Sequence, residues 1–238
     1  MVSSKVYRAI LFDVGSTLLE IVRDPNEVAA ESVAHLGELS VKDYAVAIRE
    51  IVAEWRSAGG RPEVHDLPET WISHNRLALS RIGFPGDITL AAQIIESTFL
   101  LEGLRVYADV EEVLTRLLVE GYRLGIVSNW PATLEATLRR ARLNDYFPVI
   151  VGSGNVGYAK PHPQIFRIAM DRIGVNPDET LYIGDSVEYD VAGARAAGAD
   201  VVLLDRAGKE SHQPKIQTLF QLPEFLGAGS LGPTITAR

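Results

Sequence analysis

The sequence predicts an α/β protein with a parallel sheet at its core and an all-helical insertion near its N-terminal end. Two observations lead to this class. From about residue 103 onward, short aliphatic runs alternate with amphipathic helical segments, which is typical of a parallel sheet with right-handed crossovers. Between residues 21 and 102 the short aliphatic runs give way to helical periodicity. We therefore expect a core of residues 1–20 and 103–238, and a helical cap domain at 21–102.

The first core strand is predicted at Val6–Phe12, because this run is aliphatic and too short for a helix. Within the insertion, helical periodicity is clear in Glu27–Ala34 and in Tyr44–Ile51. Glycine- and proline-rich breaks at 59–62 and 83–86 separate its helices. These segments predict a bundle of helices with no strand between them.

After the insertion, Asp109 and Glu112 are predicted to form a capping box at the start of a helix that Gly121 ends. Strands and helices then alternate. The expected strands are 123–127, 148–151, 180–183 and 200–204, and the expected helices are 131–140, 161–173 and 189–197. Asp200–Leu204 is the last strand that the pattern predicts.

Composition excludes several classes of protein. The chain has 238 residues, of which 47% are hydrophobic, enough for one large domain or a domain with an insert. Its net charge of −8 argues against nucleic acid or an anionic membrane as a partner. The lack of cysteine excludes disulfides, thiolate metal sites and cysteine nucleophiles, and a cytoplasmic location is expected. We see no signal peptide and no apolar run long enough to span a bilayer.

Polar side chains follow the predicted core strands. Asp13 comes directly after the first strand, Ser128 and Asn129 after the second, and Asp185 after 180–183, while Lys160 precedes a helix. Because the carboxyl ends of parallel strands meet at one edge of a sheet, these side chains are expected to converge. A carboxylate at the end of a buried strand is costly unless it binds a cation or takes part in chemistry.

Four segments, in the same order, resemble the motifs of the haloacid dehalogenase-like hydrolases. They are Phe12–Leu18, Val127–Asn129, Gly157–Phe166 and Gly184–Asp190, and the resemblance covers roughly residues 6–205. In that family a helical cap is inserted after the first motif, which agrees with the helical insertion here. The resemblance implies a Rossmann-like three-layer core with the strand order 5-4-1-2-3, numbered along the chain.

The resemblance also implies a mechanism and a cofactor. Asp13 would attack phosphorus and form an aspartyl-phosphate that water then hydrolyses. Mg²⁺ would be held by the Asp13 carboxylate, the Gly15 backbone carbonyl and Asp185. Asp190 would support the metal from behind these ligands or bind it through water.

The remaining motif residues are implied to bind the phosphoryl group. Ser128 and the backbone N–H of Asn129 would donate to phosphate oxygens, and Lys160 would neutralise charge on Asp13 and on the phosphate. Thr17 would orient the first loop. The implied substrate is a small phosphorylated metabolite, and the oligomeric state, monomer or homodimer, is left open.

Position 15 departs from the family pattern. Phosphatases of this family usually carry Asp there, which protonates the leaving group and later activates water. Gly15 can do neither, and general acid–base catalysis is typically worth about 10²–10⁴-fold. Loss of this acid should slow the hydrolysis of phosphates with alkoxide leaving groups most, and that of acyl or aryl phosphates least.

Three explanations of Gly15 stay open. The acid comes from elsewhere, or the chemistry needs none, as in members that cleave phosphonates or haloacids, or phosphate is bound without turnover. The candidate acids outside the first motif are Lys42, His35, His65, His74, Glu50 and His162. Lys42 is also the sole cap lysine for the Schiff base of phosphonate-cleaving members. The paired acids Asp185 and Asp190 disfavour dehalogenation, because dehalogenases of the family lack them.

Two further patterns are interpreted structurally. Gly152–Gly157 has the spacing of a dinucleotide-binding fingerprint, but residues 158–161 delay the next helix, so we interpret it as the loop that delivers Lys160. Trp130 is predicted to face the catalytic crevice because it follows Ser128 and Asn129. Trp55 and Trp71 are predicted to pack cap helices.

Overall fold

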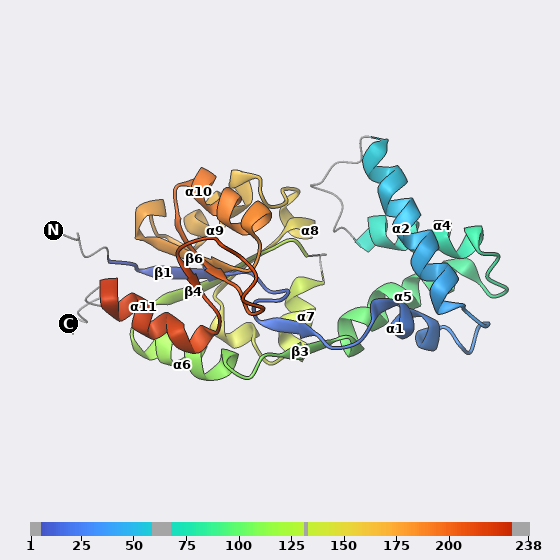
Figure 1. The fold of residues 1–238 in the computed structure, drawn as a ribbon, viewed down its shortest axis with the longest axis horizontal. Helices are drawn as coiled ribbons and strands as arrows, with labels where there is room; N and C mark the ends of the chain where they lie inside the picture. The colour runs from blue at the N-terminus through green and yellow to red at the C-terminus, as the bar shows by residue number, and fades with distance from the viewer. Residues whose placement is uncertain (1–5, 59–67, 131–132, 230–238) are drawn as a thin grey trace.

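The computed structural model describes residues 6–58, 68–130 and 133–229, and Figure 1 shows their arrangement. Six strands in these residues form one parallel sheet in the order β5-β4-β1-β6-β7-β8. The strands are β1 (Ala9–Phe12), β4 (Arg123–Ser128), β5 (Val149–Gly152), β6 (Thr180–Gly184), β7 (Asp200–Leu204) and β8 (Lys215–Ile216). Numbered along the chain, the first five core strands have the predicted order 5-4-1-2-3, which is confirmed.

The edge strand β8 was not predicted, and the expectation that Asp200–Leu204 is the last strand is wrong. β8 pairs in parallel with β7, with Lys215 opposite Leu203 and Ile216 opposite Leu204. A strand of two residues is too short to produce an alternating hydrophobic pattern. Only its partner strand makes this segment recognisable.

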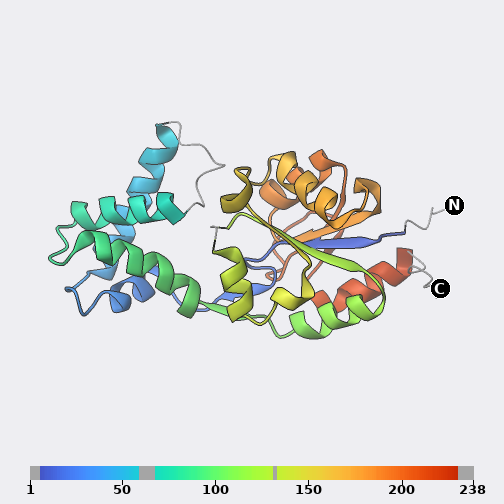
Figure 2. The same cartoon turned by 180° about the vertical axis from the view of Figure 1, so that it is seen from behind.

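Helices cover both faces of the sheet (Figures 1 and 2). In β1, Ile10 and Phe12 belong to one hydrophobic cluster, whereas Ala9 and Leu11 belong to the other. This alternation divides the core into three layers, because successive side chains of a strand point to opposite faces. One cluster includes residues of α6 (Val110–Val119), α7 (Leu134–Arg140) and α11 (Leu222–Gly229), and the other includes residues of α9 (Pro163–Ile173) and α10 (Ala192–Ala197).

The predicted helical insertion forms helices α1, α2, α4 and α5 in the described residues. Their bounds are Pro25–Ser32, Val41–Ser57, Pro68–Arg81 and Ile88–Glu102. These helices share a hydrophobic cluster of their own. The chain enters and leaves this helical unit through β2 (Leu19–Ile21) and β3 (Leu104–Val106), which pair antiparallel.

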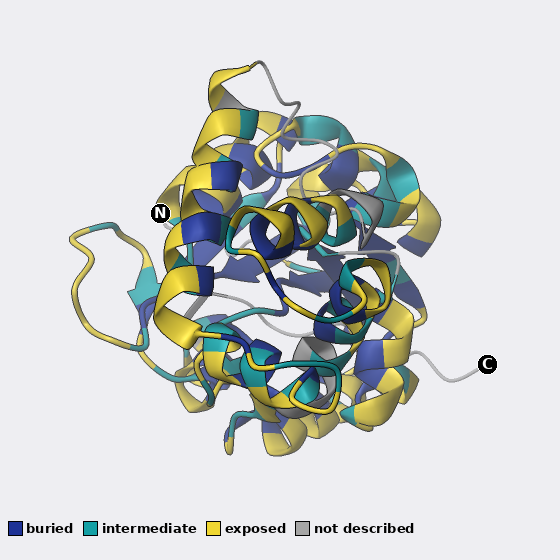
Figure 3. Cartoon of the chain, turned by 90° about the vertical axis from the view of Figure 1, so that its right-hand side faces the viewer, coloured by how far each residue is buried: buried dark blue, intermediate teal, exposed yellow. Residues whose placement is uncertain are grey.

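Figure 3 shows buried residues along the strands and exposed residues on the outward faces of the surrounding helices. All four residues of β1 are buried, as expected of a central strand in a sheet covered on both sides. Across the described ranges, every helix is too short or too polar to cross a membrane.

The predicted capping box at Asp109 is wrong. The Asp109 side chain makes no hydrogen bond to the first turn of α6. It instead accepts two hydrogen bonds of 2.9 Å from Arg206, one of 2.6 Å from the Thr218 hydroxyl and one of 2.8 Å from the Leu219 N–H. A bidentate, charge-assisted pair is stronger than a neutral cap bond, so Asp109 ties α6 to the C-terminal segment.

We predict that Asp109→Asn lowers the free energy of unfolding by about 2 kcal/mol at pH 7, the range for hydrogen bonds to charged groups. Burial alone would raise the pKa of Asp109, but the hydrogen bonds from Arg206, Thr218 and Leu219 hold that pKa below its ordinary value. A depressed pKa stabilises the fold above the pKa of the unfolded chain, about 3.9, and this contribution is lost as the pH falls further. The difference between wild type and variant should therefore shrink below about pH 4.

Urea unfolding of both proteins at pH 7 and pH 3 measures this difference. Glu112→Ala is the control, because Glu112 is exposed and alanine, unlike glutamine, could not complete a capping box. The control should change stability by less than about 0.5 kcal/mol. A control that costs as much as Asp109→Asn would contradict the assignment.

Candidate active site

The carboxyl ends of β1, β4 and β6 bring the predicted site residues to one edge of the sheet. β1 lies between the other two strands, with Phe12 opposite both Ile126 and Ile183. Asp13 follows β1, Ser128 ends β4, and Asp185 follows the last residue of β6. The parallel order of the strands thus places three polar side chains from distant segments side by side.

Lys160 is the centre of the site. Its ammonium donates hydrogen bonds of 2.6 Å to Asp13 Oδ1 and 2.6 Å to Asp190 Oδ1, and all three side chains are buried. Burial would lower the pKa of Lys160, but the two carboxylates raise it above its ordinary value. The ammonium therefore stays charged beside Asp13 and carries the positive charge of this cluster.

The Asn129 side chain holds the Lys160 backbone. Its Nδ2 donates to the Lys160 carbonyl at 3.0 Å, and the Lys160 N–H donates to Asn129 Oδ1 at 2.6 Å. The motif implies a role only for the Asn129 backbone, so these two hydrogen bonds of its side chain were not predicted. Two residues 31 positions apart give no local signal that their side chain and backbone will meet.

Tyr182 is a second residue of the site that was not predicted from the sequence. Its fully buried hydroxyl lies 2.8 Å from the Val127 carbonyl and 2.9 Å from Asp190 Oδ1, and it accepts a hydrogen bond of 3.2 Å from Lys160. The signal was available, because Tyr182 places a phenol in an otherwise aliphatic strand, and a buried Tyr hydroxyl needs partners.

Asp190 lies in a π-helix, Val187–Val191, and is fully buried. Its Oδ1 accepts from Lys160, and its Oδ2 accepts from the Ser186 N–H at 2.9 Å. A Cβ at Gly184 would lie 2.4 Å from Asp190 Cγ, so only glycine lets the carboxyl lie against the end of β6.

The carboxylates of Asp13, Asp185 and Asp190 are crowded together. Each offers an oxygen that lies within 4.8 Å of an oxygen from the other two. Burial, and then the neighbouring charges of Asp13 and Asp190, raise the pKa of Asp185 to about 7. A hard cation with oxygen ligands would relieve this repulsion, so the cluster fits a divalent metal ion.

The possible metal ligands differ in how far they are already engaged. Both oxygens of Asp190 accept hydrogen bonds from the protein. In the described part of the chain, the Asp185 carboxylate bonds to no other side chain, and the Gly15 carbonyl accepts no hydrogen bond. Asp185 and Gly15 therefore suit direct ligation, and Asp190 suits a role behind them.

The loop after β1 is a tight turn. Ser16 has a left-handed φ of 55°, and its N–H donates to the Leu19 carbonyl at 2.8 Å. The Thr17 carbonyl accepts from Arg206 at 2.8 Å, whereas its buried hydroxyl has no hydrogen-bond partner within the described ranges. The backbone of Thr17, rather than its hydroxyl, anchors the loop in this structure.

Trp130 lies over this loop. A Cβ built on Gly15 would be 3.6 Å from Trp130 Cζ3, which is ordinary van der Waals contact. The loop 152–157, interpreted above as the loop that delivers Lys160, contains the one-turn helix α8 (Ser153–Val156) and then Gly157 at a left-handed φ of 72°. The pattern of glycines did not reveal this helical turn, because four residues carry too little periodicity.

The candidate acids outside the first motif differ in environment. His35 and Lys42 are exposed, and Glu50, also exposed, pairs with Arg81 at 3.4 Å. His162 is the N-cap of α9, where its Nδ1 accepts from the Gln164 N–H. His65 lies outside the described residues.

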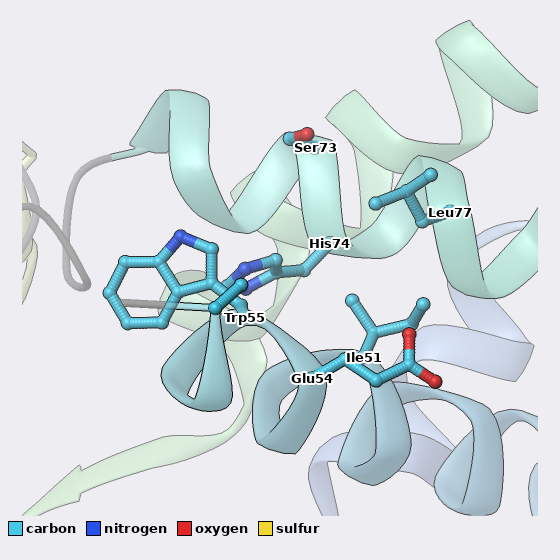
Figure 4. Close-up of a pocket in the computed structure, with 7 residues that line it drawn as sticks. Ile51, Glu54, Trp55, Ser73, His74 and Leu77 are labelled. Carbon is cyan, nitrogen blue, oxygen red and sulfur yellow. The ribbon is translucent and has the colours of Figure 1, made fainter. Parts of the chain in front are cut away.

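His74 is buried in the helical unit, beside the rings of Trp55 and Trp71, each 5.6 Å away in an edge-on arrangement. Figure 4 shows His74 and Trp55 at a cavity of about 470 Å³ between α2 and α4. Trp55 of α2 and Trp71 of α4 thus pack these two helices around a histidine.

The fold and site define a class of enzyme: a hydrolase with a Rossmann-like three-layer core, in which Asp13 follows β1, Lys160 is its buried partner, and Asp185 and Asp190 follow β6. Residues 7–198 match the family model of the haloacid dehalogenase-like hydrolases. The chain belongs to this family, as the four motifs predicted.

Among curated proteins, the chain is similar to a glyceraldehyde 3-phosphate phosphatase of Methanopyrus kandleri. They are 29% identical over 217 residues, which cover 87% of this chain and 88% of the relative. A phosphoglycolate phosphatase of Salmonella typhi is 30% identical over 209 residues, covering 82% of this chain and 80% of the relative.

Solved structures show the same fold. A HAD phosphatase from Thermococcus onnurineus superposes with a TM-score of 0.66 at 26% identity, covering 94% of this chain and 99% of that one. A 2-haloacid dehalogenase from Pseudomonas syringae pv. Tomato DC3000 reaches a TM-score of 0.72 at 23% identity, covering 94% and 99%. The second likeness concerns the fold alone.

We predict that Gly184→Ala destabilises the protein by about 1–3 kcal/mol, because its methyl group would overlap the Asp190 carboxyl. Gly227→Ala is the matched control, since a Cβ there meets no atom within 4 Å and α11 favours alanine. Urea unfolding measures both variants. If Gly184→Ala is as stable as the wild type, the Asp190 carboxyl does not lie as close to Gly184 as described here.

Proposed function

We propose that the chain is a Mg²⁺-dependent phosphatase that acts on a small phosphorylated metabolite, with Asp13 as the nucleophile. The observation that carries the proposal is the buried Lys160 bridge between Asp13 and Asp190, with Asp185 beside it. The phosphatases among the relatives support the same reaction class.

The proposed reaction has two steps. A carboxylate oxygen of Asp13 forms a bond to phosphorus while the bond from phosphorus to the leaving oxygen breaks, and the leaving group takes the electron pair. Water then attacks the aspartyl-phosphate, which releases inorganic phosphate and restores the Asp13 carboxylate. Lys160 donates to Asp13 Oδ1 and so directs the other oxygen of Asp13 toward the substrate.

The phosphoryl group would be bound by donors at the end of β4, beside the charge of Lys160 from the segment before α9. The Ser128 hydroxyl has no hydrogen-bond partner within the described residues and can donate to a phosphate oxygen. The Asn129 N–H completes the proposed set of donors, and the Lys160 ammonium, whose three N–H groups bond to Asp13, Asp190 and Tyr182, contributes its positive charge. Their preorganisation matters because donors that are already in place need no rearrangement when charge develops.

Asp13, the Gly15 carbonyl and Asp185 are the proposed ligands of Mg²⁺, and Asp190 supports them through water. When bound, the cation supplies positive charge that offsets the negative charge of the phosphoryl oxygens. The crowded acids fit this role, because burial and the charges of Asp13 and Asp190 raise the pKa of Asp185, and a cation would offset that repulsion.

The other family reactions are less well supported. A Schiff-base lysine has to be desolvated to be neutral and nucleophilic, whereas Lys42 is exposed in the first turn of α2. The presence of both Asp185 and Asp190 in the crowded cluster argues against a metal-independent dehalogenase.

We predict that Asp13→Asn lowers the turnover of acetyl phosphate and 4-nitrophenyl phosphate by at least about 10³-fold, because the nucleophile is lost. Phosphate release in the presence of Mg²⁺ measures the effect, and circular dichroism checks the fold. Asp178→Asn is the control, since Asp178 is exposed in the turn before β6. Activity that survives Asp13→Asn would refute the proposal, and phosphate binding without any turnover by the wild type would favour a binding protein.

We also predict that Gly15→Asp raises the hydrolysis of alkyl phosphates by about 10-fold or more, because it adds the missing acid. Gly15 is outside the left-handed region and a Cβ there meets Trp130 at 3.6 Å, so the backbone tolerates a side chain. Gly15→Asn has the same shape without the acid and serves as the control. A folded Gly15→Asp variant with no gain would show that another residue supplies the proton.

A further inference from the structure

The surface beside Gly15 is made of aromatic carbon. Cζ3, the Trp130 atom 3.6 Å from a Cβ at position 15, belongs to the six-membered ring of the indole. The indole nitrogen lies at the opposite edge of the side chain, as the covalent structure requires. Where the family pattern places a carboxyl group, this chain therefore presents an apolar ring edge.

Trp130 is held firmly by its backbone. Its N–H donates to the Ser153 hydroxyl at 3.1 Å, and its carbonyl accepts from the Gly154 N–H at 3.0 Å. A Cβ at Gly152 would lie 3.3 Å from the Trp130 carbonyl oxygen, so glycine lets the two segments approach closely. The backbone that carries the ring is thus fixed by α8 and the end of β5, the same segment that leads to Lys160.

The Trp130 ring is half-buried and packs against the hydrophobic cluster of the sheet. Its Nε1 is buried and has no hydrogen-bond partner within the described residues. An unsatisfied buried N–H costs free energy, and such groups call for an explanation beyond packing. The edge beside Gly15 is the carbon edge, so the group that the ring can contact there is an apolar one.

The direction of attack places the leaving group near this ring. In phosphoryl transfer the attacking and leaving oxygens lie roughly in line across phosphorus. A substrate attacked by Asp13 at the edge of the sheet therefore directs its leaving group away from the sheet. The loops after β1 and β4 border this space, and in them Gly15 offers no side chain while Trp130 offers its ring.

We propose that Trp130 is a specificity-determining residue that contacts the leaving group, and that the preferred substrates are aryl phosphates. This inference rests on the proposed phosphatase function. A flat aromatic group packs favourably against an indole ring. An aryl oxide also leaves without a proton more readily than an alkoxide does, which suits a site with Gly15 in place of an acid. Contact surface and chemistry thus select the same class of leaving group.

The test compares two substrates with activated leaving groups, 4-nitrophenyl phosphate, which carries a ring, and acetyl phosphate, which does not. For Trp130→Leu, the ratio of kcat/KM for 4-nitrophenyl phosphate to that for acetyl phosphate should fall about tenfold, equivalent to 1.4 kcal/mol. The loss should be expressed mainly in KM, because the contact is present before and during the reaction. Trp130→Phe keeps a ring and should retain most of the ratio.

Phe220→Leu is the matched control, because Phe220 is an exposed aromatic residue in the turn before α11. Thermal unfolding checks each variant, since Trp130 packs against the core. If Trp130→Leu does not fold, the inhibition of the wild-type enzyme by two phosphonates tests the same contact. Phenylphosphonate should inhibit about tenfold more tightly than methylphosphonate, because its ring would make the contact that Trp130→Leu removes.

Different outcomes would contradict the role of Trp130 and the phosphatase function. Turnover of both substrates with an unchanged ratio in folded Trp130→Leu, or equal inhibition by the two phosphonates, would overturn the role of Trp130 and leave the phosphatase intact. No turnover of either substrate by the wild type with Mg²⁺ would overturn the proposed function, and the inference with it.

Discussion

The ammonium of Lys160 between two buried carboxylates is the interaction on which the rest of the site depends. Its bonds of 2.6 Å to Asp13 and to Asp190 join segments that are 147 and 30 positions away in the sequence. Removing one member of such a cluster would leave an uncompensated buried charge, which is strongly destabilising. The site can therefore exist only if the strands that carry these residues are correctly ordered.

The surrounding residues serve to keep this cluster in place. Asn129 fixes the backbone of Lys160, Tyr182 bonds to both Lys160 and Asp190, and Gly184 leaves room for the Asp190 carboxyl. Each of them works by close packing or by hydrogen bonding inside the protein, where an unpaired polar group is expensive. The crowded carboxylates of Asp13, Asp185 and Asp190 are suited to bind a cation. The packing that stabilises the site therefore also prepares it for its proposed chemistry.

The sequence predicted features that depend on neighbouring residues and missed those that depend on distant ones. The aliphatic runs of β1 and β6 and the helical period of α2 are local patterns, and the structure contains these elements. The capping box at Asp109 failed because Arg206, 97 positions away, is a stronger partner than the first turn of α6. The strand β8 was missed because its two residues have no pattern without β7.

Short motifs and the topology of parallel sheets are enough to identify the family, the order of the core strands and the polar residues at their carboxyl ends. The contacts of those residues became known from the folded chain. The phenol of Tyr182 and the side chain of Asn129 take their positions from contacts across the sheet edge. Such contacts arise from the packing of separate segments, and no periodicity along the chain encodes them.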